Sequence, residues 1–254
     1  MPRSVPDRQP RTRCGGERPA PCQTCTVEHL SEPGRCQAPE RVSRLRSARL
    51  YLVCGRQDDR FLEAVLRGGV GIVQLRLKRA GDQEIVSTSR RFARVCAAHG
   101  ALFILNDRPD LVAAAGADGV HVGQNDVSVG QARELIGPDR LLGLSTHSDA
   151  QIDAARTIEV LDYIGVGPVY ETPTKPGRDA VGLDVVRHAA AHATTPFFAI
   201  GGINEVTVGG VLAAGASRVA VVRALVDAED PESAAKRLRQ AVERKRQAVG
   251  AAQS

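Results

Sequence analysis

The stretch ALFILNDRPDLVAAAGADGVHVGQND, residues 101–126, holds two short apolar runs that each end in polar residues. The runs Leu102 to Asn106 and Gly119 to Val122 are rich in Val, Ile, Leu or Phe, as strands buried on both faces of a parallel sheet require. A helix starting near Pro109 fits between them. The stretch therefore predicts one strand–helix–strand unit of an α/β fold.

The same pattern repeats along the chain from Ala48 onward. Six further runs have the composition of buried strands: Leu50 to Cys54, Ile72 to Arg76, Leu141 to Ser145, Leu161 to Gly165, Phe197 to Ile200 and Arg218 to Val222. Amphipathic stretches separate the runs, as in the apolar stripe of Ile85, Phe92 and Val95. Eight such units in 208 residues fit a compact barrel, whereas a doubly wound sheet of that many units would be unusual. The sequence predicts a single (β/α)8 TIM barrel over residues 47–254.

Residues 1–46 have a different composition. They hold nine Arg against five Asp and Glu, and seven of the fourteen prolines. Such a segment buries too little apolar surface to offset its ordering entropy, so it is predicted to be a disordered extension. Four of the six cysteines lie in it, at positions 14, 22, 25 and 36; four thiolates can hold zinc, but these spacings match no common zinc motif. Since Met1 is the only methionine, a translation start near Val42 is an alternative that removes the extension.

Charge and composition exclude two classes of partner. The net charge is +5, and residues 1–46 contribute +4 of it (nine minus five), so the remainder is nearly neutral. With 3% aromatic residues and no Trp, the chain has neither the basic face nor the stacking rings of a nucleic-acid-binding protein. No apolar run is long enough to span a membrane, and no signal-peptide core is present. We expect no membrane partner and a cytoplasmic location.

Polar residues close the predicted strands, and in a TIM barrel these ends build the active site. In Gln74-Leu75-Arg76-Leu77-Lys78, alternation places the three polar residues on one side and the two leucines on the other. Two cations pointing the same way suggest an anion site rather than a solvated strand end. This segment is predicted to bind an anionic group.

Two carboxylates follow neighbouring strands. Asn106-Asp107 ends one strand, and Gly123-Gln124-Asn125-Asp126 follows the next. Mg²⁺ prefers one or two carboxylates with water and phosphate oxygens, so Asp107 and Asp126 beside Arg76 and Lys78 predict a metal–diphosphate cradle. In the alternative interpretation, these acids cap the following helices, although Ser128 is better placed to cap the second.

The later strand ends supply groups for a second anion. Ser145 can donate to a phosphate oxygen, and the loop from Gly165 to Gly177 is rich in Gly and Pro and can cover a substrate. The last two strands end in Ile200-Gly201-Gly202-Ile203 and Val221-Val222-Arg223, the arrangement of many barrel phosphate sites. We therefore expect a diphosphate near the second to fourth strands and a monophosphate near the last two.

Together these motifs resemble the set found in thiamine-phosphate synthases. The resemblance rests on Gln74 to Lys78, Asn106-Asp107, His121-Val122-Gly123-Gln124-Asn125-Asp126, Gly143-Leu144-Ser145, Thr172-Pro173-Thr174-Lys175 and Ile200 to Ile203. It spans Leu50 to about Leu225 in order. One of these motifs alone would be weak, whereas six at matching strand ends are specific.

The resemblance implies a Mg²⁺-dependent transferase that joins a pyrimidine diphosphate to a thiazole phosphate and releases pyrophosphate. Its catalytic residues would be Arg76, Lys78, Ser145 and Lys175, and one Mg²⁺ would lie on Asp107 and Asp126. The pyrimidine diphosphate would contact Gln74, Leu75, Arg76, Leu77, Lys78, Asn106, Ser145 and Lys175. The thiazole phosphate would contact Thr172, Thr174, Gly202, Val222 and Arg223, and Pro173 would be a further substrate-binding residue. Arg223 departs from the family, which often has a small polar residue there.

Two other functions were weighed. A related thiazole tautomerase has no diphosphate substrate, and so no use for Asp107, Asp126 and Lys175. A non-catalytic phosphate-binding barrel is a different class, which the intact site residues argue against. His121 and His147 lie near the same rim, but the reaction needs no general acid or base, so both are interpreted as structural.

Overall fold

The computed structural model describes residues 39–172 and 179–252, and it confirms the predicted TIM barrel. Eight parallel strands close into one barrel, and β8 pairs with β1. The strands are β1 Leu50–Cys54, β2 Ile72–Leu75, β3 Leu102–Asn106, β4 Gly119–Val122, β5 Leu141–Thr146, β6 Tyr163–Val166, β7 Phe197–Ile200 and β8 Val219–Val221.

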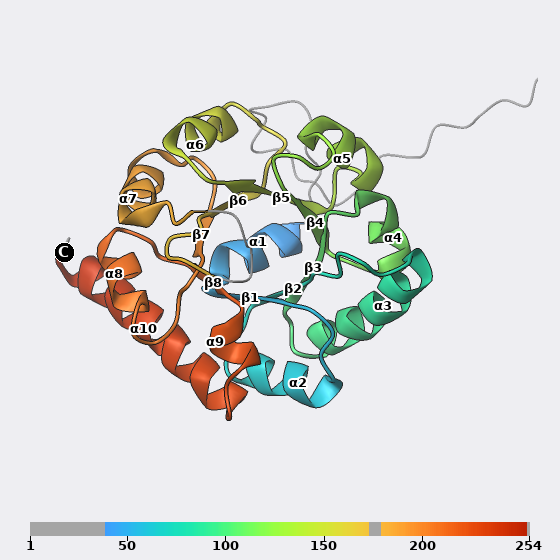
Figure 1. Ribbon diagram of the computed structural model, residues 1–254, viewed down its shortest axis with the longest axis horizontal. Coiled ribbons are helices and arrows are strands. Elements are labelled where there is room, and N and C mark those ends of the chain that lie inside the picture. The colour runs from blue at the N-terminus through green and yellow to red at the C-terminus, as the bar shows by residue number, and fades with distance from the viewer. Residues whose placement is uncertain (1–38, 173–178, 253–254) are drawn as a thin grey trace, which may run out of the picture. The chain divides into compact units, whose positions relative to one another are not determined.

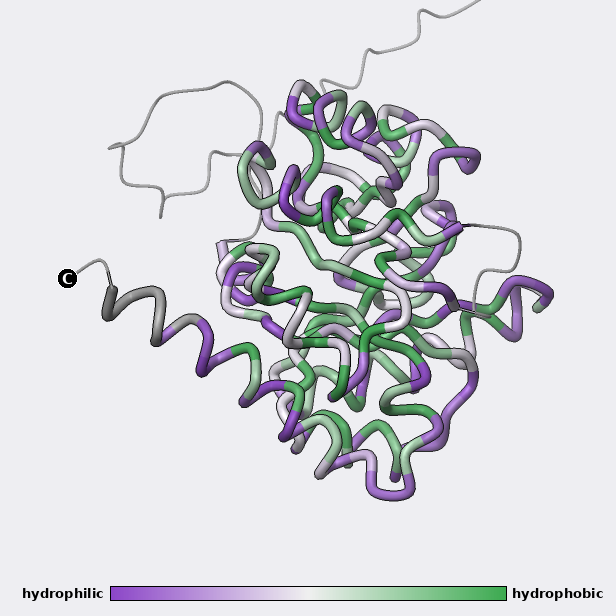
Figure 2. Tube along the Cα trace, turned by 60° about the vertical axis from the view of Figure 1, so that its left-hand side comes forward, coloured by the Kyte–Doolittle hydropathy of each residue, from purple (hydrophilic) through white to green (hydrophobic). Residues whose placement is uncertain are grey.

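Helices surround the strands as an outer ring (Figure 1). They are α2 Asp59–Arg67, α3 Asp82–Ala98, the 3-10 helix η1 Pro109–Leu111, α4 Val112–Ala115, α5 Val129–Ile136, α6 Asp149–Arg156, α7 Gly182–His192, α8 Val208–Ala213, α9 Arg223–Val226 and α10 Pro231–Ala252. Hydrophobic residues concentrate along the strands and the inward sides of the helices (Figure 2). No described helix is both long and apolar enough to cross a bilayer.

Alternation along each strand divides the core into two layers. In β1, Leu50 and Leu52 pack between the barrel and the helices. Tyr51 and Val53 point the other way, into the barrel interior, where they meet residues such as Phe198. Because side chains repeat every two residues, each strand sends one set to the helices and the other along the barrel axis.

A helix that the sequence did not predict closes the amino-terminal end of the barrel. Residues 39–46 fall in the segment predicted to be disordered, but they form most of α1 (Pro39–Ser47). Leu45 is 1% exposed and belongs to the interior layer. Arg41 donates to Asp118 at 2.9 Å, and Arg44 donates to the Ala101 carbonyl at 2.6 Å. For these residues the prediction was wrong, and residues 1–38 lie outside the described part.

Candidate active site

A cavity of about 830 Å³ lies at the carboxyl ends of the strands. Most of the predicted site residues line it: Gln74, Arg76, Lys78, Asn106, Asp107, Asp126, Ser145, Thr172, Gly202, Val222 and Arg223. Pro173, Thr174 and Lys175 fall outside the described residues. Residues from both halves of the barrel therefore form the cavity, at the carboxyl ends of the strands where TIM barrels build their active sites.

The polar residues at the end of β2 face the cavity in the predicted alternation. Gln74, Arg76 and Lys78 line it, whereas Leu75 is fully buried in the layer between the barrel and the helices. Leu77 packs against that same layer. Neither leucine side chain lines the cavity, so any contact of these two residues with a substrate would come from their backbone.

The two carboxylates lie beside each other at the rim. Asp126 accepts a hydrogen bond from the Gly123 amide at 2.7 Å, and Lys78 lies 3.8 Å from Asp107. The pKa of Asp107 is raised from 3.8 to about 6, first by burial and then by the neighbouring carboxyl of Asp126, against the opposing effect of Lys78. Asp107 also has φ of +62°, a left-handed conformation that Asp tolerates better than most residues.

Neither carboxylate caps a helix. The N-cap of η1 is Arg108, with no side-chain cap, and Ser128 caps α5 in a reciprocal box with Gln131. The helix-capping interpretation of Asp107 and Asp126 is therefore wrong. Both acids remain available for a ligand at the cavity rim.

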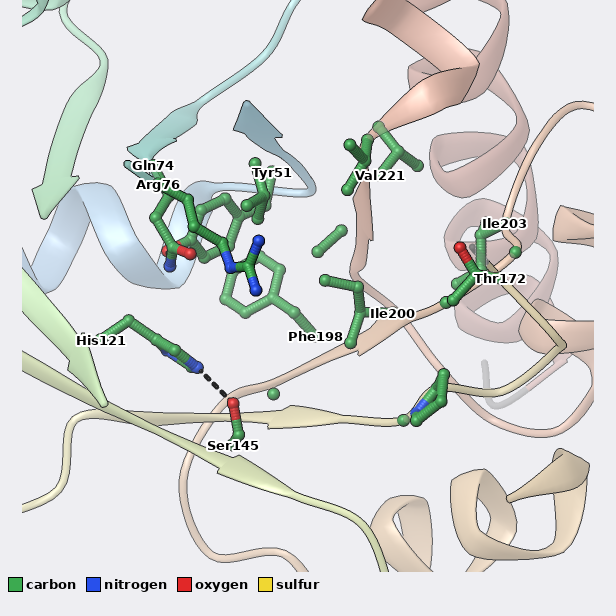
Figure 3. A pocket seen from close by; sticks show the side chains of 18 of the residues that line it. Tyr51, Gln74, Arg76, His121, Ser145, Thr172, Phe198, Ile200, Ile203 and Val221 are labelled. Carbon is green, nitrogen blue, oxygen red and sulfur yellow. Dashed lines mark hydrogen bonds between the residues drawn. The ribbon is translucent and has the colours of Figure 1, made fainter. Parts of the chain in front are cut away.

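Five polar side chains form a hydrogen-bonded series across the cavity wall, here called the Gln74–Ser145 network. Gln74 Nε2 donates to the Tyr51 hydroxyl at 2.7 Å, and the Tyr51 and Tyr163 hydroxyls are 3.0 Å apart. Tyr163 lies 3.2 Å from His121 Nδ1, and His121 Nε2 lies 2.9 Å from Ser145 Oγ. Figure 3 shows the last of these bonds and the position of Tyr51 beside Gln74. All five residues are buried.

Sequence reasoning missed three members of this network. The sequence interpretation gives His121 a structural role and places Tyr51 and Tyr163 in apolar runs. A signal was present, because a tyrosine at an inward position of a barrel strand must find a partner for its hydroxyl. His147, also interpreted as structural, lines the cavity too and contacts the Gly167 carbonyl through Nδ1.

The opposite wall comes from the last three strands and the loop after β6. Thr172 lies there beside Ile203 (Figure 3). Gly201 has φ of +106°, and a Cβ on it would lie 2.4 Å from Pro168 Cα, so only glycine permits this close approach. Gly202, Val222 and the start of α9 line the same side of the cavity. This wall is less charged than the wall formed by β2 to β4.

Comparison with known proteins agrees with the motifs. The family model described as thiamine monophosphate synthase matches residues 50–225. A thiamine-phosphate synthase of Acidothermus cellulolyticus is 52% identical over 197 residues, which cover 75% of this chain and 93% of that protein. One from Thermosynechococcus vestitus is 45% identical over 200 residues, but the match covers 78% of this chain and only 57% of that longer relative.

A solved structure agrees as well. The thiamine phosphate pyrophosphorylase from Pyrococcus furiosus superposes with a TM-score of 0.71 at 30% identity, covering 78% of this chain and 96% of its own. The predicted resemblance to the thiamine-phosphate synthase family is confirmed. This chain belongs to the thiamine monophosphate synthase family.

Proposed function

We propose that this protein joins 4-amino-2-methyl-5-(diphosphooxymethyl)pyrimidine to 4-methyl-5-(2-phosphooxyethyl)thiazole, or to its carboxylated form, giving thiamine phosphate and pyrophosphate. The observation that carries the proposal is one cavity with two unlike walls. Arg76, Lys78, Asp107 and Asp126 line one wall, and the glycine-containing end of β7 and the end of β8 line the other. Two phosphorylated substrates can therefore meet in a single chamber.

The wall of β2 to β4 suits the pyrimidine diphosphate. Arg76 and Lys78 both face the cavity and can bind diphosphate oxygens, Arg76 through two parallel N–H donors. Asn106 and Ser145 add uncharged polar groups on the neighbouring strands. Lys175 would add a third cation from the loop, as the family motif implies.

The carboxylate pair fits Mg²⁺. Asp107 is half-buried, and the neighbouring carboxyl of the exposed Asp126 helps to raise its pKa. A divalent cation between the two carboxyls would offset this repulsion. The described residues contain no group of three or more His, Cys, Asp or Glu arranged for a metal. Asp107 and Asp126 would therefore share the ion with diphosphate oxygens and water. When bound, Mg²⁺ would neutralise part of the diphosphate charge.

With the uncarboxylated thiazole, the proposed reaction breaks one bond and forms one; the carboxylated form would in addition lose its carboxyl group as CO2, with a proton from water taking its place. The bond between the pyrimidine methylene carbon and the diphosphate oxygen breaks, and its electron pair leaves with pyrophosphate. The thiazole nitrogen then gives its lone pair to the methylene cation. No proton needs to move in either step, so the residues contribute mainly charge stabilisation and alignment. Arg76 and Lys78 would stabilise the departing anion, and the enclosed cavity would hold the two rings in line.

The opposite wall suits the thiazole phosphate. Backbone N–H groups near Gly202 and Val222 would bind the monophosphate, and Thr172 would donate from the loop. Arg223 also lines the cavity, and we propose that it adds a cation to this phosphate site.

We further propose that the enzyme works in the cytoplasm. Cys54 and Cys96 are both buried and unpaired. Burial raises the pKa of the Cys54 thiol to about 12, which keeps it protonated and unreactive. Neither cysteine forms a disulfide in the described structure, so neither requires an oxidising compartment.

The test is a direct assay. Purified protein would be mixed with both substrates and Mg²⁺, and thiamine phosphate and pyrophosphate would be followed with and without EDTA. Equimolar products that require the metal would support the proposal. Folded protein that forms neither product would favour a thiazole tautomerase, if it isomerises the thiazole phosphate, or a binding role if it does not.

A further inference from the structure

One hydrogen-bond direction gives every proton of the Gln74–Ser145 network an acceptor. Gln74 contacts Tyr51 through its amide nitrogen, which can only donate, so the Tyr51 oxygen accepts. The one remaining partner of the Tyr51 hydroxyl in the described structure is Tyr163, so Tyr51 donates to it. Burial raises the pKa of both phenols, so each keeps its proton.

The direction continues to the histidine. The Tyr163 oxygen accepts from Tyr51, so its own proton is directed to His121 Nδ1 at 3.2 Å. In this arrangement Nδ1 accepts and carries no proton, and the ring proton lies on Nε2. Nε2 donates to Ser145 Oγ at 2.9 Å. Ser145 is thus an acceptor within the network, and its own proton stays available to a ligand.

The two ends of the network therefore carry opposite hydrogen-bonding groups. Gln74 uses its amide nitrogen on Tyr51, which leaves its carbonyl oxygen as an acceptor. Ser145 uses its oxygen on His121, which leaves its O–H as a donor. Both residues line the cavity. Between them, Tyr51, Tyr163 and Phe198 form an apolar aromatic surface, with ring centroids 5.2 to 6.0 Å apart.

We propose that Tyr51 and Tyr163 are positioning residues that fix an acceptor at Gln74 and a donor at Ser145 for the pyrimidine diphosphate, an inference that rests on the proposed function. A flat aminopyrimidine offers a ring face, N–H donors and nitrogen or phosphate-oxygen acceptors, which match the aromatic surface and the two ends. The tyrosine hydroxyls do not need to touch the substrate. They act by holding Gln74 and the His121–Ser145 pair in one hydrogen-bond arrangement.

The kinetic test uses isosteric variants. Tyr163→Phe removes the proton that fixes His121, and we expect kcat/KM for the pyrimidine diphosphate to fall about tenfold, as for one buried hydrogen bond. The KM for the thiazole phosphate should stay within about twofold, since that substrate binds the other wall. Ser89→Ala is the matched control, because it also removes a buried hydroxyl; Ser89 lies in α3, and its hydroxyl has no hydrogen-bond partner among the described residues. It should change neither constant.

The spectroscopic test needs no substrate. In protein labelled with ¹⁵N-histidine, with His121 assigned by comparison with His121→Gln, His121 should carry its proton on Nε2. Tyr163→Phe should shift this signal toward a mixture of both tautomers. Tyr51→Phe should leave the His121 signal unchanged, because Tyr163 still has His121 as an acceptor. The same variant should weaken pyrimidine diphosphate binding, because Gln74 loses its hydrogen-bond partner.

The outcomes separate two hypotheses. Wild-type protein that forms no thiamine phosphate would refute the proposed function, whatever the histidine signal. Active wild-type protein with its His121 proton on Nδ1 would overturn the hydrogen-bond direction. Unchanged kinetics in folded Tyr163→Phe, with thermal unfolding checked, would overturn the positioning role. An equal fall in kcat/KM for both substrates would also count against the positioning role, because that pattern indicates a general structural defect.

Discussion

The replacement Asp107→Asn should stabilise the metal-free protein at high pH. In the folded state the pKa of Asp107 rises from 3.8 to about 6, chiefly through burial and then through Asp126. Ionised Asp107 therefore destabilises the fold. The penalty is absent well below pH 3.8, grows as the pH rises toward 6, and is complete above that. Asparagine is uncharged and also tolerates a positive φ, so it removes the charge while keeping the backbone.

The magnitude follows from the same values. The difference between 3.8 and about 6 corresponds to about 3 kcal/mol of unfolding free energy at pH 8. This value already includes the opposing attraction of Lys78, which lies 3.8 Å from Asp107. The gain should therefore be about 3 kcal/mol at pH 8 and about half of that at pH 5, where wild-type Asp107 is mostly protonated in the folded state.

The assay is urea unfolding followed by circular dichroism in EDTA, at pH 8 and pH 5. Asp139→Asn is the control, because Asp139 is exposed and lies outside the cavity lining. It should change stability by less than about 0.5 kcal/mol at both pH values. An Asp107→Asn protein that is less stable than wild type at pH 8, or whose gain is equal at the two pH values, would refute the electrostatic argument.

Three other changes test the site. Adding Mg²⁺ with pyrophosphate should raise the Tm of the wild-type protein but raise that of Asp107→Asn much less, as measured by calorimetry; equal shifts would remove Asp107 from the metal site. Lys175→Ala should lower kcat in steady-state kinetics by roughly two to three powers of ten, because it removes a group that stabilises charge in the transition state. A change confined to the affinity for the thiazole phosphate would show this assignment wrong. Gly143→Ala should lower kcat/KM and the Tm together, because its Cβ would lie 2.2 Å from the Tyr163 ring and 2.6 Å from His121. Gly130→Ala, where nothing lies within 4 Å, should leave activity intact and stabilise α5 by about 0.5 kcal/mol.

Strand positions could be predicted well because buried parallel strands are short apolar runs with polar ends. The bounds of β1, β3, β4 and β7 agree with the runs read from the sequence. β6 begins at Tyr163 rather than Leu161, because Asp162 accepts from the Leu142 amide and from Arg133 and so anchors the turn before the strand. Leu161 is buried all the same. Apolar composition therefore locates burial more reliably than it locates strand ends.

Helix α1 could not be predicted, because what holds it is distant in sequence. Its own segment is rich in Arg and has only Val42 and Leu45 as apolar residues. The contacts that fix it reach Asp118, 77 residues away, and the Ala101 carbonyl, 57 residues away. Composition describes what a segment can bury by itself. It does not describe the open end of a barrel that the segment can fill.

The Gln74–Ser145 network was missed for a related reason. Each member has a plausible local role when read alone, and only barrel closure brings β1, β2, β4, β5 and β6 around one cavity. The tyrosines serve two purposes there, because Tyr51 and Tyr163 belong to the apolar interior of the barrel and also line the cavity.

Stability and substrate positioning therefore depend on the same two side chains. Replacing Tyr163 by a small residue would open a cavity in the core and cost several kcal/mol, on the order of 3 to 5 for a large aromatic, which would hide any effect on hydrogen bonding. Phenylalanine keeps the ring contacts with Tyr51 and Phe198 and removes only the hydroxyl. Only that substitution separates what the ring does for the fold from what the hydroxyl does for the site.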